Sequence, residues 1–221
     1  MNAFEAELRA VPGYHHLHPF NLRMHAGELS REELRGWILN RFHYQRHIPV
    51  KDAYVMAKLE TPELRRAWLR RIQDHDGVRP GEGGIERWLR LGEATGLSRD
   101  LLLSGEEVLP GVRMAVDGYV NLCRNGTVLE AVAASLTELF APDLMQTRIA
   151  AFEKHYPWIS SDGLRYFRIR VDQGRQDSAE ALALVLSWAR DRSSQTAAVA
   201  ALRFKCDVLW ALLDAVSGAY R

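Results

Sequence analysis

The sequence of 221 residues has only two cysteines and almost no net charge. Cys123 and Cys206 both lie in segments with helical patterning, and two isolated thiols do not make a disulfide framework. The 29 basic side chains nearly cancel the 28 acidic ones, so the chain lacks the overall field that binds nucleic acid or an anionic membrane. These shortages favour a reduced, cytoplasmic setting and argue against a nucleic-acid partner.

Long hydrophobic runs are absent as well. No stretch reaches the ~18 apolar residues that span a bilayer, and the first residues, MNAFEAELRAVPGYHH, carry early acidic side chains and no apolar run of a secretion signal. The chain also has no alternating strand pattern, no internal repeat and no nucleotide-binding glycine loop. We therefore expect a protein without a membrane segment, and a fold that is not built on strands.

What the sequence does contain is helical periodicity almost throughout. Ser30 and Glu33 form a capping box before a long helix, and Thr61 with Pro62 starts the next helix, which stops at Gly77. Later helices are predicted over about 127–154, 161–174, 178–193 and 195–219. The whole chain, residues 1–221, is predicted to form one compact, single-domain, all-α bundle of about eight to ten helical segments.

The last helix has a lysine on its apolar face. At 100° per residue, Lys205 falls inside a stripe of leucine and valine, whereas Asp207 and Asp214 point elsewhere. An unpaired buried ammonium is costly, so Lys205 must reach solvent, pair with an internal carboxylate or face an acidic ligand. The pattern alone leaves these three possibilities open.

A second helical stretch, ELFAPDLMQTR, gathers polar groups on one face. Thr137, Glu138, Ala141, Met145 and Arg148 fall within an arc of about 100° at helical spacing. Pro142 cannot donate a backbone hydrogen bond and is expected to kink that helix. The segment is therefore predicted to form a pocket wall, with an ordinary surface ion pair as the alternative.

Other polar residues recur at helical spacing. Arg41 with Gln45, and Tyr166 with Arg170, are each four residues apart and share a face. Tyr119 lies on a mostly apolar helix and needs a partner for its hydroxyl if it is buried. A final candidate, His75, stands at a helix end between two aspartates, where it can act as a general base or simply favour the helix C-terminus.

Histidines also raise the possibility of a metal site. His43 and His47 have the spacing of a helical ligand pair, but no third ligand is placed by the pattern, so metal binding is weakly supported. Three more histidines occur in YHHLHPF, where spacing does not decide their role. The residues together favour a small polyanionic organic ligand and proton-transfer chemistry.

Several long motifs resemble one known family. These are YHHLHPF, GWILNRFHYQRHIPVKDA, RRIQDHDG, SLTELFAP and FKCDVLWALLDA, and the chain that contains them is similar over nearly its whole length to the pyrroloquinoline quinone (PQQ) synthase family, PqqC. The resemblance implies a haem oxygenase-like, TenA-like helical bundle, usually a homodimer. It also implies ring closure and oxidation of a polycarboxylate quinone precursor by molecular oxygen, with release of hydrogen peroxide and without metal or redox cofactor.

The same resemblance assigns roles to residues of this chain. The expected catalytic residues are His75, Tyr119, Tyr166, Arg170 and His15. The expected substrate-binding residues are Arg41, Gln45, Thr137, Glu138, Arg148 and Lys205. In this assignment the cations, Arg170 included, hold carboxylates and carbonyls of the substrate, His75 removes a proton, and the tyrosine hydroxyls contact the reacting ring and oxygen.

One position departs from the family pattern. Met145 stands where the family has a histidine, and a methionine neither transfers protons nor donates a hydrogen bond. Two alternatives to a full oxidase therefore stay open. One is a metal-dependent oxygenase that uses His43 and His47, or the N-terminal histidines, with carboxylates such as Glu138; the other is a non-catalytic relative that binds or delivers PQQ.

Overall fold

The computed structural model describes residues 2–220, and the side chains at positions 138, 141, 142, 172 and 174–176 lie outside that description. Within this range the chain forms helices and no strand, which confirms the predicted all-α class. The α-helices are α1 (Ala3–Arg9), α2 (Pro19–Ala26), α3 (Arg31–Ala57), α4 (Pro62–Asp76), α5 (Gly83–Ala94), α6 (Arg99–Ser104), α7 (Pro110–Asn125), α8 (Val128–Ala134), α9 (Ala141–His155), α10 (Arg165–Trp188) and α11 (Arg192–Ala219). Three short 3₁₀ helices are η1 (His15–Leu17), η2 (Ser135–Phe140) and η3 (Asp162–Leu164).

The predicted helix starts are present. The Glu33 amide donates to Ser30 Oγ at 3.1 Å, and the Ser30 amide donates to Glu33 Oε2 at 2.7 Å, so the capping box of α3 is complete. Thr61 accepts from the amide of Leu64 at the start of α4, and Gly77 ends that helix with a positive φ of 83°. Local sequence therefore sets the ends of the helices that carry much of the site.

Two predicted helix boundaries are wrong. The segment 127–154 is not one helix, because α8 ends at Ala134 and the chain winds as the 3₁₀ helix η2 before α9 begins at Ala141. Residues 161–174 and 178–193 do not form two long helices, because α10 runs unbroken from Arg165 to Trp188. The middle of α10 contains the weaker helix formers Asp172, Gly174, Asp177 and Ser178, but packing of α10 against α8, α9 and η2 overrides that preference.

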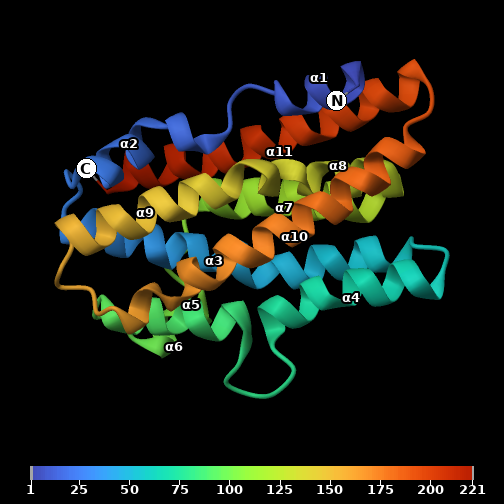
Figure 1. Ribbon diagram of the computed structural model, residues 1–221. Helices are drawn as coiled ribbons and strands as arrows, with labels where there is room; N and C mark the ends of the chain where they lie inside the picture. The colour runs from blue at the N-terminus through green and yellow to red at the C-terminus, as the bar shows by residue number, and fades with distance from the viewer. Residues whose placement is uncertain (1, 221) are drawn as a thin grey trace.

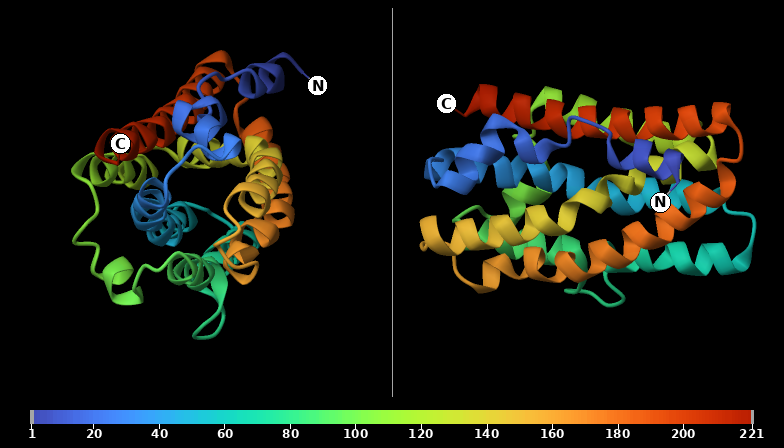
Figure 2. Two further views of the ribbon diagram at one scale, coloured as in Figure 1. Left: turned by 90° about the vertical axis from the view of Figure 1, so that its left-hand side faces the viewer. Right: turned by 45° about the horizontal axis from the view of Figure 1, so that its top comes forward.

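The long helices run alongside one another with α3 at the centre (Figures 1 and 2). Helix α3 packs against α4, α5, α7 and α11, and α10 packs against α9 and η2. Rings from α3, α5, α9 and α10 meet in an aromatic cluster, in which Trp37 and Trp88 lie edge to face at 5.5 Å and Phe152 and Phe167 complete the contacts. This cluster joins the helices on which the polar site is built.

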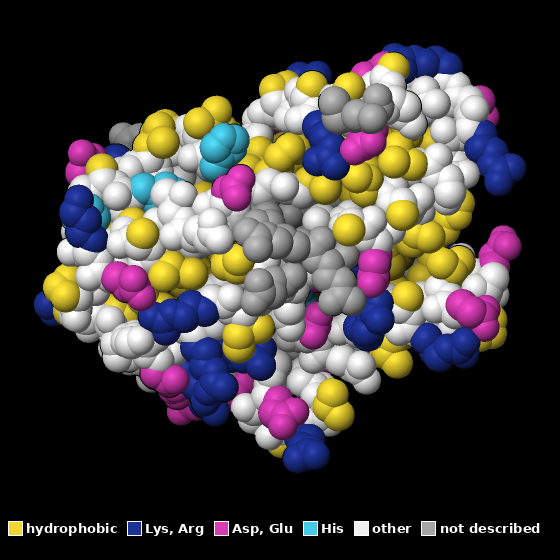
Figure 3. Space-filling model, viewed as in Figure 1, with side chains coloured by type: hydrophobic (Ala, Val, Ile, Leu, Met, Phe, Trp, Pro, Cys, Tyr) yellow, Lys and Arg dark blue, Asp and Glu magenta, His cyan; other side chains and the backbone are white. Residues whose placement is uncertain are grey.

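The surface fits the balanced composition. On the face in Figure 3, basic and acidic side chains are interspersed rather than gathered into a field of one sign. None of the helices formed by residues 2–220 is both long enough and apolar enough to cross a bilayer. Cys123 and Cys206 are buried free thiols, as the sequence suggested.

Candidate active site

A small cavity of about 60 Å³ lies inside the bundle, where α3, α4, η2, α9, α10 and α11 converge with the segment before α2. Most of the residues that line it carry a polar group. The lining residues are Tyr14, His15, Arg41, Tyr44, Gln45, Ile48, His75, Thr137, Met145, Tyr166, Arg170 and Leu209. Seven of the eleven expected site residues therefore meet at one place, together with Met145.

Helix α3 presents one continuous face to this cavity. Arg41, Tyr44, Gln45 and Ile48 follow the i, i+3, i+4, i+7 spacing, so the predicted shared face of Arg41 and Gln45 is confirmed. The buried Gln45 accepts a hydrogen bond through Oε1 from the Tyr166 hydroxyl at 3.0 Å. The Arg41 guanidinium stacks over the Tyr44 ring at 4.0 Å. This face thus presents the Gln45 amide and the Arg41 cation to the cavity, and each of them contacts a tyrosine.

His75 is buried in the last turn of α4, and its tautomer follows from its contacts. Its Nδ1 lies 3.0 Å from the carbonyl oxygen of Arg71. Because a carbonyl oxygen only accepts, Nδ1 carries the hydrogen in the neutral ring and Nε2 is the basic nitrogen. A neutral ring with a basic Nε2 at the cavity is chemically able to act as a general base, so the predicted role of His75 stays a prediction.

Lys205 is buried in the middle of α11, at 1% exposure, so it does not reach solvent. Its ammonium donates to the Tyr44 hydroxyl at 2.8 Å and lies 3.5 Å from the centre of the Tyr119 ring. Among the described side chains no carboxylate pairs with it. Burial, followed by the nearby Arg41 and Lys51, holds the pKa of Lys205 well below its ordinary value.

Arg148 of α9 is a second buried cation. Its guanidinium lies 5.0 Å from the centre of the Trp37 ring and donates through Nη2 to Asn21 Oδ1 at 3.0 Å. Its Nε is buried with no hydrogen-bond partner among the described residues. Burial and then the charge of Arg41 lower the pKa of Arg148 to about 10. A buried cation with an unused donor is chemically prepared for an anion.

His15 and Tyr119 complete the polar surroundings. His15 is buried at the cavity, and its pKa is well below the ordinary value because of burial and then the cations Arg41 and Arg148. Tyr119 is buried one layer behind the cavity, where its ring stacks at 6.4 Å on the ring of Tyr44, which lines the cavity. Burial raises the pKa of Tyr119 well above its ordinary range, so the phenol stays neutral.

Arg170 differs from the other cations because it has a carboxylate partner. Its Nη1 lies 3.5 Å from Asp177 Oδ2, about two turns further along α10, and Asp177 also contacts Arg71 of α4. The predicted shared face of Tyr166 and Arg170 is confirmed, since both line the cavity. This pairing fixes Arg170 at the rim between α4 and α10.

The pocket wall expected at residues 137–148 forms, although not by the expected geometry. Thr137 and Met145 both line the cavity, but they belong to η2 and α9, so the single helical arc was wrong. Arg148 is buried instead of forming a surface ion pair. Glu138 lies outside the described side chains, so its predicted inward orientation stays a prediction.

The predicted histidine ligand pair is present without a third partner. The rings of His43 and His47 lie 4.4 Å apart, and His47 Nδ1 contacts the carbonyl oxygen of His43 at 2.7 Å. No group of three histidine, cysteine, aspartate or glutamate side chains with metal-binding geometry occurs among the residues that the structure describes. His43 and His47 are also absent from the cavity lining, so they form a separate feature.

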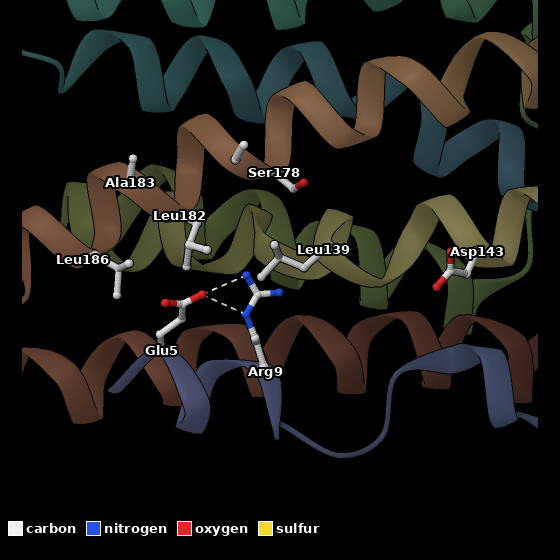
Figure 4. Close-up of a pocket in the computed structure, with 9 residues that line it drawn as sticks. Glu5, Arg9, Leu139, Asp143, Ser178, Leu182, Ala183 and Leu186 are labelled. Carbon is white, nitrogen blue, oxygen red and sulfur yellow. Dashed lines mark hydrogen bonds and ion pairs between the residues drawn. The ribbon is translucent and has the colours of Figure 1, made fainter. Parts of the chain in front are cut away.

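A larger hollow on the outside of the bundle is a different kind of place. It measures about 540 Å³ and lies between α1, η2 and α10 (Figure 4). Its main charged groups, Glu5 and Arg9, pair with each other at 2.9 Å, and leucines form much of the remaining lining. Glu5 and Arg9 thus satisfy each other's charge, and none of the predicted site residues lines this hollow.

Four lining residues were not predicted from the sequence. Tyr44 and Ile48 continue the helical face begun by Arg41 and Gln45, so the same spacing rule applied further would have found them. Tyr14 directly precedes His15, but its ring has no periodic signal. Leu209 follows Lys205 at four residues on α11 and could not be told apart from ordinary core.

Comparison with solved structures identifies the fold class of this protein. A TenA homologue from Pseudomonas syringae superposes with a TM-score of 0.79 at 14% identity, over 98% of this chain and 93% of that one. A domain with a haem oxygenase-like fold from Shewanella denitrificans gives a TM-score of 0.77 at 13% identity, over 98% and 88%. The protein therefore has the haem oxygenase-like fold, as predicted.

Sequence comparison then gives the family. A profile described as the TENA/THI-4/PQQC family matches residues 6–215, and the chain belongs to that family. The pyrroloquinoline-quinone synthase of Cronobacter sakazakii is 51% identical over 218 residues, which is 98% of this chain and 87% of that protein. The pyrroloquinoline-quinone synthase of Pseudomonas aeruginosa is 51% identical over 219 residues, with the same coverage.

Proposed function

We propose that this protein is a pyrroloquinoline-quinone synthase, which closes and oxidises a quinone precursor in the last step of PQQ formation. The observation that carries the proposal is a set of cations around the cavity, of which Arg148 and Lys205 are buried and Arg41 is half-buried. Arg41, Arg148 and Lys205 have no carboxylate partner among the described side chains. Two PQQ synthases that are 51% identical to this chain over 98% of its length support the same conclusion.

The cations bind the substrate in this proposal. Each substrate carboxylate loses its bound water when it enters the cavity. Charge-assisted hydrogen bonds from the lysine and arginine side chains, which are already shielded from water, compensate for that loss. Arg148 contributes its unused Nε donor, and Lys205 contributes an ammonium already held by Tyr44. Gln45 and Thr137 offer neutral polar contacts at the cavity wall, and we assign Glu138 to the same substrate-binding group.

Proton transfer divides between groups on different helices. Nε2 is the basic nitrogen of His75, and we assign it to removing a proton from the substrate, as a positioned general base does. Tyr166 donates its hydroxyl to Gln45 at the cavity wall, and we assign that hydroxyl to hydrogen-bonding the reacting ring. We assign Arg170 beside it and Tyr119 behind it to stabilising the negative charge that develops in the ring and on oxygen.

Oxygen is the proposed electron acceptor. A reduced quinol-type ring gives two electrons and two protons to one molecule of oxygen, which forms one hydrogen peroxide and leaves the ring oxidised. The protein then has to bind, orient, deprotonate and exclude water, and it needs no metal or redox cofactor of its own. We also propose that the protein works as a homodimer, which light scattering of the purified protein tests.

The cavity size bears on how the substrate enters. At about 60 Å³ it is well below the about 300–1,000 Å³ of typical small-molecule pockets. A multi-ring polycarboxylate therefore requires the lining side chains and helices to move apart before it is enclosed. Binding of PQQ should accordingly alter the protection of α9 and α10 in hydrogen exchange.

A second candidate is a relative that binds PQQ without making it. The observation that favours it is Met145, which lines the cavity at the position where a proton-handling histidine was expected. The cation set would still bind the ligand, whereas oxidation would be slow or incomplete. This candidate and the main proposal differ in turnover and not in binding.

One experiment separates the two. The purified protein is mixed with the PQQ precursor without oxygen, oxygen is then admitted, and absorbance and peroxide are followed. Formation of bound PQQ together with peroxide is the result expected of the synthase. Binding with no oxidation supports the second candidate, and no binding contradicts both. Parallel metal analysis and addition of a chelator test the metal-dependent alternative.

A further inference from the structure

We propose that Asn21 of α2 is a positioning residue, which holds Arg148 in place and fixes the tautomer of His15. The inference rests on the proposed function and adds a residue to its machinery that does not itself line the cavity. Asn21 is fully buried, at 0% exposure, so its amide must be satisfied inside the protein. Among the described residues, the hydrogen bonds of its side chain go to Arg148 and His15.

The orientation of the Asn21 amide follows from its partners. Arg148 Nη2 lies 3.0 Å from one end of the amide, and a guanidinium only donates, so that end is the oxygen. The other end lies 2.7 Å from the carbonyl oxygen of His15, and a carbonyl only accepts, so that end is the NH₂ group. Two independent contacts thus agree on one orientation.

The same amide then determines the state of His15. The NH₂ group of Asn21 has a second hydrogen, and His15 Nδ1 lies 3.4 Å away. A donor facing Nδ1 requires a lone pair there, which leaves the hydrogen of the neutral ring on Nε2. His15 is thereby a hydrogen-bond donor at Nε2, whereas His75 has its lone pair at Nε2.

The two histidines of the cavity can therefore work in opposite senses. His75 accepts a proton and His15 donates a hydrogen bond to a carbonyl or to developing negative charge, without either ring changing its tautomer first. The charged and titratable groups that act on His15 are Arg41 of α3, Arg148 of α9, Lys205 of α11 and the adjacent His16. The three cations disfavour a protonated ring, which keeps His15 neutral.

Helix α2, which carries Asn21, is fixed against helix α11 of the site. His18 caps α2 by accepting from the amide of Phe20 at 3.1 Å through Nδ1. Its Nε2 then faces Asp214 of α11 at 3.0 Å. Helix α2 is therefore anchored to the helix that bears Lys205, and the amide of Asn21 is held relative to both.

The test combines a direct reading of the tautomer with matched variants. Nitrogen NMR of histidine-labelled protein identifies which ring nitrogen of His15 carries hydrogen, with His15→Gln used for assignment. Asn21→Asp keeps an acceptor for Arg148 but replaces the donor to His15 with a carboxylate. Asn40→Asp is the control, because Asn40 is an equally buried asparagine whose amide contacts Gly36, Leu109 and Tyr220, away from the cavity.

The expected results are specific. Wild-type His15 should show hydrogen on Nε2, and Asn21→Asp should move hydrogen to Nδ1 and raise the pKa of His15. The variant should lose about 10- to 100-fold in kcat/KM for PQQ formation and acquire a new acid limb in its pH profile. Asn21→Ala should lose activity without that new limb, and Asn40→Asp should keep the wild-type pH profile and the wild-type His15 signal.

Two results would overturn the inference. One is a wild-type His15 with hydrogen on Nδ1, and the other is a folded Asn21→Asp protein whose His15 signal and pH profile match wild type. Circular dichroism of each variant separates a misfolded protein from an altered site, and the wild-type tautomer is decided even if Asn21→Asp does not fold. If the wild-type protein makes no PQQ, the proposed function fails, whereas the NMR reading still decides whether Asn21 fixes His15.

Discussion

Lys51 and Lys205 are both buried lysines whose ammonium groups face the ring of Tyr119, yet their charges are satisfied in different ways. Lys51 pairs with Asp52 at 2.6 Å and donates to Ser135 at 3.0 Å. The Asp52 carboxylate also accepts from the Trp68 indole at 2.9 Å. Lys205 has only the Tyr44 hydroxyl and the tyrosine rings among the described residues.

The difference separates structural charge from functional charge. A buried ion pair is costly to break, because removing one partner leaves the other charge uncompensated. A buried cation without an anion lowers stability, and it persists in a protein when a ligand supplies the anion. We therefore assign Lys51 to the fold, and we propose that Lys205, with Arg148, binds a polycarboxylate.

The largest expected effect is on stability at Lys51. Lys51→Met should destabilise the protein by about 3–5 kcal/mol, because Asp52 is left as a buried charge without its cation. Urea unfolding followed by circular dichroism measures this change. The double variant Lys51→Met with Asp52→Leu should recover a large part of the loss. A single variant as stable as wild type would mean that this pair is not structural.

Lys205→Met should show the opposite pattern. We expect about a 30- to 100-fold weaker affinity for PQQ, because a charge-assisted contact of about 2–3 kcal/mol is removed. The free energy of unfolding should stay unchanged or rise, since an unpaired buried cation is replaced by an apolar chain. Equilibrium titration and urea unfolding measure both quantities. Strong destabilisation with unchanged affinity would place Lys205 with Lys51 as a structural residue.

Met145→His tests catalysis separately from binding. A histidine at this cavity position restores a group that transfers protons, so the oxidation rate should rise by about tenfold while substrate affinity changes less. Single-turnover kinetics after admission of oxygen measures the rate. Met145→Gln serves as the control, because it adds polarity without proton transfer. An unchanged rate in the histidine variant contradicts the role assigned to this position.

His43 is a third kind of buried titratable group, one that stays neutral instead of being paired or bound. Its Nε2 has no partner among the described residues, and burial, followed by His47 and the nearby arginines, lowers its pKa from 6.5 to about 4. In the unfolded chain His43 becomes protonated below about pH 6.5, whereas in the folded protein it becomes protonated only at about pH 4. Stability due to this site is therefore complete above pH 6.5 and is lost as pH falls toward 4.

His43→Leu should remove that acid sensitivity. The slope of the free energy of unfolding between pH 6.5 and 4 should fall by up to about 1.4 kcal/mol per pH unit. Urea unfolding at several pH values measures the slope. His16→Gln is the matched control, because His16 is exposed and its loss should leave the slope unchanged. The same slope in both variants would contradict the buried, neutral state of His43.

Sequence patterns predicted which residues line the site better than they predicted the secondary structure of the segments that carry those residues. Helical spacing placed Arg41 beside Gln45 and Lys205 inside the apolar stripe of α11, since a regular helix fixes which residues share a face. It failed at residues 135–140, where the 3₁₀ winding of η2 depends on packing. It did not find Asn21, because a single buried asparagine has no period and its partners are distant in sequence.

The central claim is that unpaired buried cations select a polycarboxylate. The most direct test compares the affinity of the wild-type protein for PQQ with its affinity for PQQ in which the carboxylates are methyl esters. The ring system is the same in both ligands, whereas the negative charges are removed in the second. We expect the ester to bind at least about 100-fold more weakly, which corresponds to about 2.7 kcal/mol or more. Equal affinities for the two ligands would contradict the claim.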